Sequence, residues 1–157
     1  MKPLSLTLVV VLLSCSFLNA QTNIINYGSN WKYLDNGSNQ GTAWRATAFN
    51  DASWASGNAQ LGYGDGDEAT VVSYGPNANN KYTTTYFRKT ITVANASAFT
   101  SFTINIKRDD GAVVYINGTQ RFRTNMPSGN ITYTTRASTD ASDDGNTAQA
   151  ITIPAGS

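Results

Sequence analysis

Residues 108–119, RDDGAVVYINGT, decide the fold of this chain. They place an acidic turn, a five-residue apolar run and an Asn-Gly pair in direct succession. Asn and Gly tolerate the positive φ angles of a two-residue hairpin, so we expect the chain to reverse at Asn117–Gly118 and to return as a strand from Thr119 to Arg123. Every position of Ala112–Ile116 is apolar, which predicts a central strand covered on both faces. The stretch therefore predicts a β protein.

Other segments of the chain also show strand patterns rather than helix patterns. Residues 101–107 alternate between polar and apolar side chains, as in a half-buried strand. Residues 86–93 predict another strand, with Phe87, Ile91 and Val93 on one side. Connectors rich in Gly, Asn, Ser and Asp separate these segments, so we expect one all-β domain, a β-sandwich of jelly-roll type. Further short strands are predicted at residues 131–135 and 150–153.

The first twenty residues predict a secretory signal peptide, which leaves residues 21–157 as the domain. Lys2 is followed by an apolar run over residues 4–13, and Ala20 offers a small residue at the cleavage point. The run is too short for a transmembrane span. An alternative is a loose lipobox ending at Cys15, which would anchor the protein through a lipid. Either way we expect a secreted or cell-surface protein with no transmembrane segment in its mature form.

Composition excludes most catalytic classes. The chain has no histidine, and its single cysteine lies in the leader. The mature domain therefore has no disulfide, no thiol nucleophile, no Ser-His triad and no histidine or cysteine metal site. The 11 basic and 10 acidic residues form no basic run, so nucleic acid is not an expected partner. We expect the chain not to be an enzyme.

Three motifs resemble a known family. Trp44-Arg45 followed by FNDASW at residues 49–54 is similar to the F-(D/N)-D-x-x-W stretch of jelly-roll domains in β-galactosidase-type glycoside hydrolases. Residues 86–93 resemble the Y-x-R-x-x-F-x-V strand of those domains, and residues 109–118 resemble their D-D-x-A-x-V-x-V-N-G hairpin. The resemblance implies a galactose-binding-like fold. Because fold alone does not determine function, sugar binding is what this analogy implies.

Residues 31–38, 61–70 and 122–127 are also similar to an N-terminal accessory domain of secreted Bacteroidetes-like multidomain proteins. Such domains often precede metallophosphoesterase-like, spore-coat-kinase-like or sorting domains. In that family a strand similar to N-V-I-A-V-E-V follows a Gly turn near the domain end. The chain shows no such segment before Ser157, so the resemblance predicts a sandwich truncated before its last strand.

An acidic loop contains Asp65, Asp67 and Glu68, whose oxygen atoms are of the type that Ca²⁺ prefers. The spacing departs from the EF-hand pattern, because Ala69 stands where the third ligand should be. A structural Ca²⁺ site is one interpretation. The alternative is a turn whose carboxylates accept backbone N–H bonds.

The candidate sugar-binding residues are Trp44, Arg45, Tyr63 and Asp65. Pyranose rings stack on aromatic side chains, while charged and amide groups bond the hydroxyls. Trp31 and Trp54 are expected to pack in the core instead.

Charged residues around the hairpin have two interpretations. Asp109 and Asp110 are adjacent and therefore point to opposite faces, which excludes a glycosidase pair in one cleft. We expect Asp110 to cap the tight turn, and Asp109 to pair with Arg108 or Arg88. A second set, Arg121 and Arg123, shares one strand face. These two arginines could clamp an acidic ligand, although pairing with Asp109 or Asp110 is the ordinary explanation.

Taken together, the patterns predict a non-catalytic, carbohydrate-binding-like accessory module of a secreted multidomain bacterial protein. Its expected partners are a polysaccharide or glycan and a downstream domain of the same protein. The alternative is a spacer that precedes a hydrolase, for example a metallophosphoesterase-like domain, and binds no sugar itself.

Overall fold

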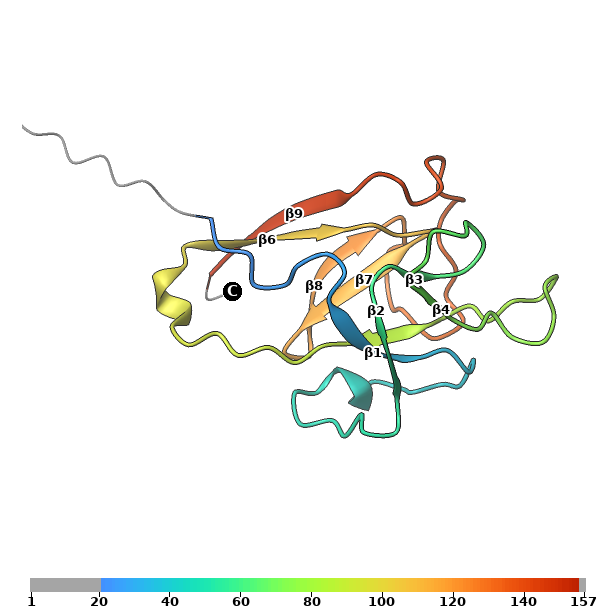
Figure 1. Cartoon of the computed structure of the whole chain (residues 1–157), viewed down its shortest axis with the longest axis horizontal. Coiled ribbons are helices and arrows are strands. Elements are labelled where there is room, and N and C mark those ends of the chain that lie inside the picture. The colour runs from blue at the N-terminus through green and yellow to red at the C-terminus, as the bar shows by residue number, and fades with distance from the viewer. Residues whose placement is uncertain (1–20, 156–157) are drawn as a thin grey trace, which may run out of the picture.

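Short strands joined by long turns make up residues 21–155, the part of the chain that the computed structural model describes (Figure 1). The elements in order are β1 (Asn30–Leu34), the 3-10 helix η1 (Ala43–Arg45), β2 (Ala55–Asn58), β3 (Leu61–Gly62), β4 (Thr70–Val71), β5 (Tyr86–Arg88), the 3-10 helix η2 (Ala96–Ala98), β6 (Ser101–Ile106), β7 (Ala112–Ile116), β8 (Thr119–Thr124) and β9 (Gln149–Pro154). The predicted leader, with Cys15, lies outside the described residues. Within those residues, neither helix has the length and apolar character needed to cross a bilayer.

The strands form four hydrogen-bonded groups. β1 lies between β2 and β5 in an antiparallel sheet, β6 pairs with β9, and β7 pairs with β8, both antiparallel. The short strands β3 and β4 pair in parallel. The chain is essentially all-β, and its several antiparallel sheets are consistent with a β-sandwich. The predicted fold class is confirmed.

The hairpin of β7 and β8 forms at the predicted place. Asn117 and Gly118 have φ angles of 50° and 81°, both positive, as a type I′ turn requires. Ile116 pairs with Thr119 across this turn. The register shifts between Val114 and Tyr115, which leaves Arg121 as an extra residue in β8. Because this irregularity is a β-bulge, it alters which side chains of β8 lie opposite Tyr115.

The β6–β9 pair follows the predicted alternation. Phe102, Ile104 and Ile106 are half-buried, and the residues between them are exposed. On the exposed face, the hydroxyls of Thr103 and Thr152 lie 3.0 Å apart and form a cross-strand hydrogen bond. β9 extends one residue beyond the predicted segment at each end. Period-2 alternation was sufficient to find β6, and the short strand predicted at residues 150–153 is the inner part of β9.

Three strand predictions are wrong in part. β5 ends at Arg88, and its buried residue is Tyr86 while Phe87 is 37% exposed, which is the reverse of the predicted face. Its partner β1 pairs with it only over residues 86–88, so the strand is short. Residues 131–135 form a turn closed by Thr132 and Thr135 instead of a strand. β7 pairs only with β8 and is half-covered, so it is not a central strand.

The core is small and aromatic. Its buried apolar residues, within the described part of the chain, are Trp54, Val72 and Tyr86. The rings of Trp54 and Tyr86 lie 6.1 Å apart, and Phe49 meets Trp54 edge-on at 5.7 Å. The prediction that Trp54 packs in the core is confirmed. Trp31, in contrast, is half-buried on β1.

Candidate functional site

Trp44 and Arg45, two of the predicted sugar-binding residues, lie on η1 against the β7–β8 hairpin. The Trp44 ring meets Tyr86 edge-on at 5.1 Å and Tyr115 at 5.6 Å. The Arg45 guanidinium lies over the Tyr115 ring, 4.2 Å from its centre. Arg88 fixes this loop because its guanidinium donates to the carbonyl of Trp44. Trp44 is half-buried, so it both packs the loop and borders the surface.

Tyr63 belongs to a different surface. Its ring meets Tyr74 edge-on at 5.2 Å, and the Lys81 ammonium lies 4.8 Å above the Tyr63 ring and 5.6 Å from that of Tyr74. Burial, and then the negative charges of Asp109 and Asp110, raise the pKa of the Tyr63 hydroxyl.

The structure therefore divides the predicted sugar-binding set in two. Among the described residues, no ring contact or hydrogen bond joins Trp44 or Arg45 to Tyr63 or Asp65. The first pair lies beside the β7–β8 hairpin, and the second pair lies in the loop between β3 and β4. Two separate surfaces must be considered.

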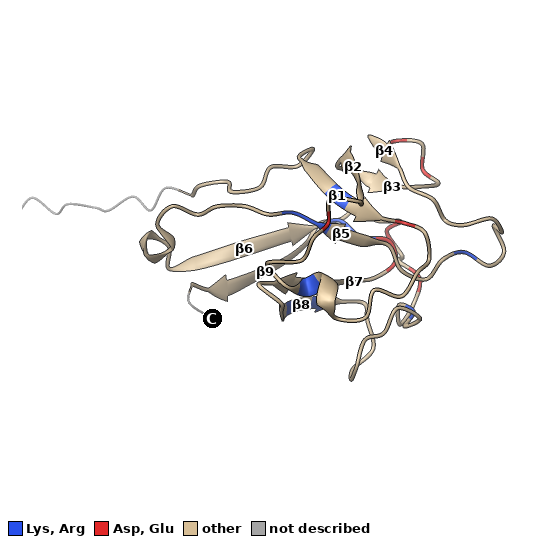
Figure 2. Ribbon diagram, turned by 90° about the horizontal axis from the view of Figure 1, so that it is seen from below, with Lys and Arg blue, Asp and Glu red and all other residues tan. Residues whose placement is uncertain are grey.

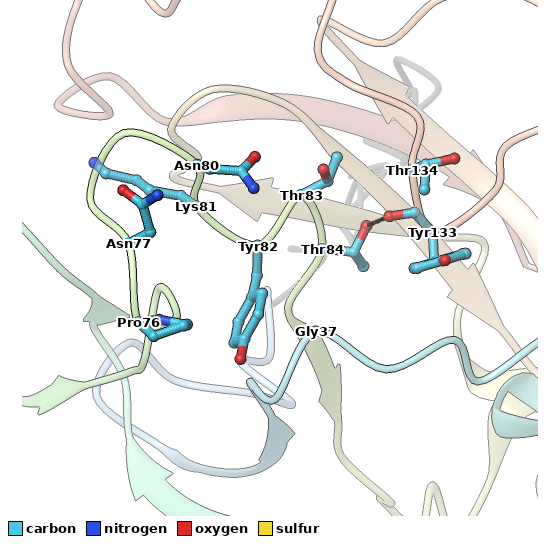
Figure 3. Close-up of a pocket in the computed structure, with 10 residues that line it drawn as sticks. All are labelled: Gly37, Pro76, Asn77, Asn80, Lys81, Tyr82, Thr83, Thr84, Tyr133 and Thr134. Carbon is cyan, nitrogen blue, oxygen red and sulfur yellow. Dashed lines mark hydrogen bonds between the residues drawn. The ribbon is translucent and has the colours of Figure 1, made fainter.

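A cavity of about 250 Å³, which was not predicted from the sequence, adjoins the cluster of Tyr63 and Tyr74 (Figure 3). We call this cavity the Tyr82 pocket. Its lining is polar and aromatic and contains no carboxylate. The lining residues are Gly37, Pro76, Asn77, Asn80, Lys81, Tyr82, Thr83, Thr84, Tyr133 and Thr134. Lys81 belongs both to this pocket and to the Tyr63–Tyr74 cluster, so the two features adjoin.

Two glycines hold the Tyr82 ring as one wall of this pocket. A Cβ atom at Gly37 would lie 2.4 Å from the ring, and one at Gly75 would lie 3.0 Å from it. Both glycines have positive φ, 71° and 96°, so larger residues would be strained as well as crowded. The Tyr82 backbone N–H is held by the Tyr74 carbonyl at 2.9 Å. The only signal in the sequence was a tyrosine between turn-rich segments.

The acidic loop is a turn in which a carboxylate accepts backbone N–H bonds, which was the alternative to a Ca²⁺ site. The two carboxylate oxygens of Glu68 accept the backbone N–H groups of Asp65 and Gly66 at 3.1 and 3.0 Å. The hydrogen bond from Asp65 is the main cause of a lowered pKa at Glu68. Ligand oxygens of Asp65, Asp67 and Glu68 lie within 4.8 Å of one another, so these residues could hold a cation. Structural Ca²⁺ stays a prediction.

The acidic loop also faces a second loop that contains Asp144. The cavity between the two loops measures about 310 Å³, and Asp65, Asp67 and Asp144 line it. The charge of Asp144 is the main cause of a raised pKa at Asp65. Burial and the charge of Asp110 raise the pKa of Asp109, with a smaller contribution from Asp144. Crowded carboxylates therefore repel one another at neutral pH.

Replacing Asp144 by Asn should relieve this repulsion. The pKa values of Asp65 and Asp109 are higher in the folded state than in the unfolded state. Protonation of these two carboxyl groups therefore favours folding at low pH. This contribution to stability is lost as the pH rises through the folded-state pKa values. Asn also tolerates the φ of 51° at this position. We expect D144N to raise the melting temperature at pH 7 by roughly 1–3 °C, and the gain to disappear below about pH 3, where both states are protonated.

Thermal melts followed by circular dichroism at both pH values test this. D140N is the matched control, because Asp140 is exposed and is not a cause of either raised pKa. An equal gain in D140N would show that net charge, not the local cluster, governs stability.

The charge pairing predicted around the hairpin is wrong. Asp110 accepts the backbone N–H of Ala141 at 2.8 Å and so bridges to a distant loop instead of capping its own turn. Arg88 pairs with Asp51 at 2.9 Å, and Arg108 pairs with Asp143 at 3.7 Å. These are the ion pairs of the described residues, so Asp109 has no arginine partner there, and neither Arg121 nor Arg123 pairs with an aspartate.

Comparison with known protein families, with curated proteins and with solved structures gives no match. Function must therefore be inferred from the geometry of three surfaces: the Trp44–Arg45 region, the Tyr82 pocket with the Tyr63–Tyr74 cluster, and the acidic loop. The Tyr82 pocket is the surface that combines a cavity with aromatic, amide and hydroxyl groups.

Proposed function

We propose that the chain is a non-catalytic carbohydrate-binding accessory module, and that sugar enters the Tyr82 pocket. The observation that supports this is the combination of an aromatic wall with amide and hydroxyl groups in one small cavity. Sugars need both, since their C–H faces stack on rings and their hydroxyls take hydrogen bonds. At about 250 Å³ the pocket lies just below the usual range for drug-sized ligands, which suits one sugar unit of a longer chain.

The pocket residues divide into fixed and available groups. Tyr82 is held by its glycines, whereas the Tyr133 side chain is 38% exposed and makes no ring contact in the described part of the chain. Thr84 donates its hydroxyl to the Tyr133 carbonyl at 2.7 Å, which positions that residue (Figure 3). The Asn80 side-chain amide makes no hydrogen bond among the described residues and lines the pocket. Tyr133 and Asn80 are thus the groups that a sugar would contact.

The wider setting of the module follows from the sequence. The leader supports secretion or attachment to the cell surface, and the family resemblance supports a place beside a catalytic or sorting domain in a longer bacterial protein. In this role the module would hold its neighbouring domain on a polysaccharide. The absence of histidine, and an Asp110 carboxylate already engaged by the backbone N–H of Ala141, support a non-catalytic role.

Replacing Tyr133 by Ala should weaken polysaccharide binding without unfolding the protein. Loss of one exposed stacking ring is expected to lower the affinity about ten-fold, which corresponds to about 1.4 kcal/mol. Affinity electrophoresis in gels that contain plant, algal or host polysaccharides, after a glycan-array screen, measures the change. Tyr27→Ala is the matched control, because Tyr27 is 69% exposed and lies outside the pocket. Failure of the wild-type protein to bind any glycan, or equal loss in both variants, would contradict the proposal.

A spacer that binds no sugar is the second candidate. The small core favours it, because the inward residues of β6 and β9 are half-exposed and a neighbouring domain could cover them. A spacer would show no glycan binding, and it would melt together with its neighbour rather than on its own.

A further inference from the structure

Three arginines near the hairpin have an incomplete set of partners. Arg45, Arg121 and Arg123 are half-buried, and the Nε atom of each is buried without a hydrogen-bond partner. Arg123 satisfies its other nitrogens, because it donates to the Gln120 side chain at 2.9 Å and to the carbonyls of Pro127 and Gly129. Its role is to hold the turn after β8.

Arg45 and Arg121 differ from Arg123 in this respect. Neither side chain makes a hydrogen bond or ion pair within residues 21–155, where the two ion pairs use Arg88 and Arg108. A half-buried guanidinium without an acceptor loses hydration and gains nothing in return. Arg45 is partly compensated by stacking on Tyr115. Two cations are thus left without anions.

The fold places these two arginines on neighbouring elements. Arg45 lies 4.2 Å from the centre of the Tyr115 ring, and Arg121 is the extra residue of β8, between Gln120, which pairs with Tyr115, and Phe122, which pairs with Val114. The tip of the hairpin also approaches η1, since a Cβ at Gly118 would lie 3.7 Å from the Arg45 carbonyl. Figure 2 shows the blue segments of η1 and β8 side by side.

We propose that Arg45 and Arg121 form an oxyanion site that takes the carboxylate or sulfate group of an acidic sugar. A guanidinium presents two parallel N–H groups that match such an anion, and an anion between two cations relieves their repulsion. Trp44 stands beside Arg45 and gives the attached sugar ring an apolar surface. That the anion is carried on a sugar rests on the proposed function; the oxyanion site itself does not.

Small anions test the site directly. Sodium sulfate should raise the melting temperature of the wild-type protein above that in sodium chloride of equal ionic strength. R121Q should lose the part of this difference that comes from the site and keep only the general stabilisation that sulfate gives any folded protein, while R136Q, a change at an exposed arginine outside the site, should keep the full difference. Because Arg121 has no hydrogen-bond partner, R121Q should melt no lower than wild type in chloride. Equal responses of R121Q and R136Q would overturn the site.

Binding of acidic and neutral polysaccharides then shows whether the anion is carried on a sugar. Binding of polygalacturonate, a sulfated galactan and a neutral galactan is compared in wild type, R121Q and R136Q. We expect an acidic polymer to lose about ten-fold or more in affinity in R121Q only, and the better of the two acidic polymers shows whether carboxylate or sulfate is preferred.

Three outcomes separate the two proposals. Stabilisation by sulfate without any polysaccharide binding would support the oxyanion site and refute the sugar-binding function. Neutral and acidic polymers that bind equally in all three proteins would support sugar binding and overturn the acidic specificity. Binding of single-stranded DNA in preference to acidic polysaccharide, lost in R121Q, would overturn the sugar as the carrier of the anion.

Discussion

Replacing Trp54 by Ala should remove about 3–5 kcal/mol from the free energy of unfolding, the largest loss that we expect from a single side chain. Trp54 is 5% exposed, and its ring joins Phe49 to Tyr86 across the β2–β1–β5 sheet. The cost combines the lost burial of a large ring with the cavity that it leaves. Typical domains are stable by only about 5–15 kcal/mol, so W54A would remove a large share of the total stability.

Urea denaturation followed by circular dichroism measures this loss. Val71→Ala is the matched control: Val71 precedes the buried Val72 but is 70% exposed, so its loss should cost about 0.5 kcal/mol or less. Trp54→Phe keeps an aromatic ring and should retain part of the stability. If W54A lost less than about 1 kcal/mol, the aromatic cluster could not be the core of the domain.

Local signals in the sequence were sufficient for the parts of the fold that depend on local physics. The Asn117–Gly118 pair specifies its own turn, and alternation over residues 101–106 specifies which face of β6 is buried. The prediction for residues 86–93 failed because the length of β5 is set by β1, more than fifty residues earlier, which pairs with only three of its residues.

Prediction of the candidate sites shows the same limit. The acidic loop was found because its carboxylates are close in the sequence, and their bonds to the backbone are local. The Tyr82 pocket was missed because Gly37, residues 75–84 and residues 133–134 meet only in the folded chain. The prediction of charge pairing failed for the same reason, because Arg108 pairs with Asp143, which belongs to a loop that no local signal places beside the hairpin.

Arg88 is the residue on which the Trp44–Arg45 region most depends. Its side chain is 11% exposed, and it donates to the Asp51 carboxylate at 2.9 Å, to the Ala46 carbonyl at 3.2 Å and to the Trp44 carbonyl. These bonds fasten the loop that carries η1 to β5. Replacing Arg88 by Met keeps much of its length and removes its charge, which leaves Asp51 and two carbonyls without their donor.

We expect R88M to lower the free energy of unfolding by about 2–4 kcal/mol, somewhat less than a fully buried pair would, since Asp51 is partly exposed. R136M, at an exposed arginine, should cost about 0.5 kcal/mol or less in the same urea titration. In the double variant R88M/D51N the loss should be smaller than the sum of the single losses, because each single change strands the other partner. Additive losses would show that the Arg88–Asp51 pair itself contributes nothing, and that Arg88 acts through its bonds to the two carbonyls and its packing on Phe49. Because the two carbonyls flank Arg45, R88M should also weaken the stabilisation by sulfate, and this links the stability of the loop to the oxyanion site that it carries.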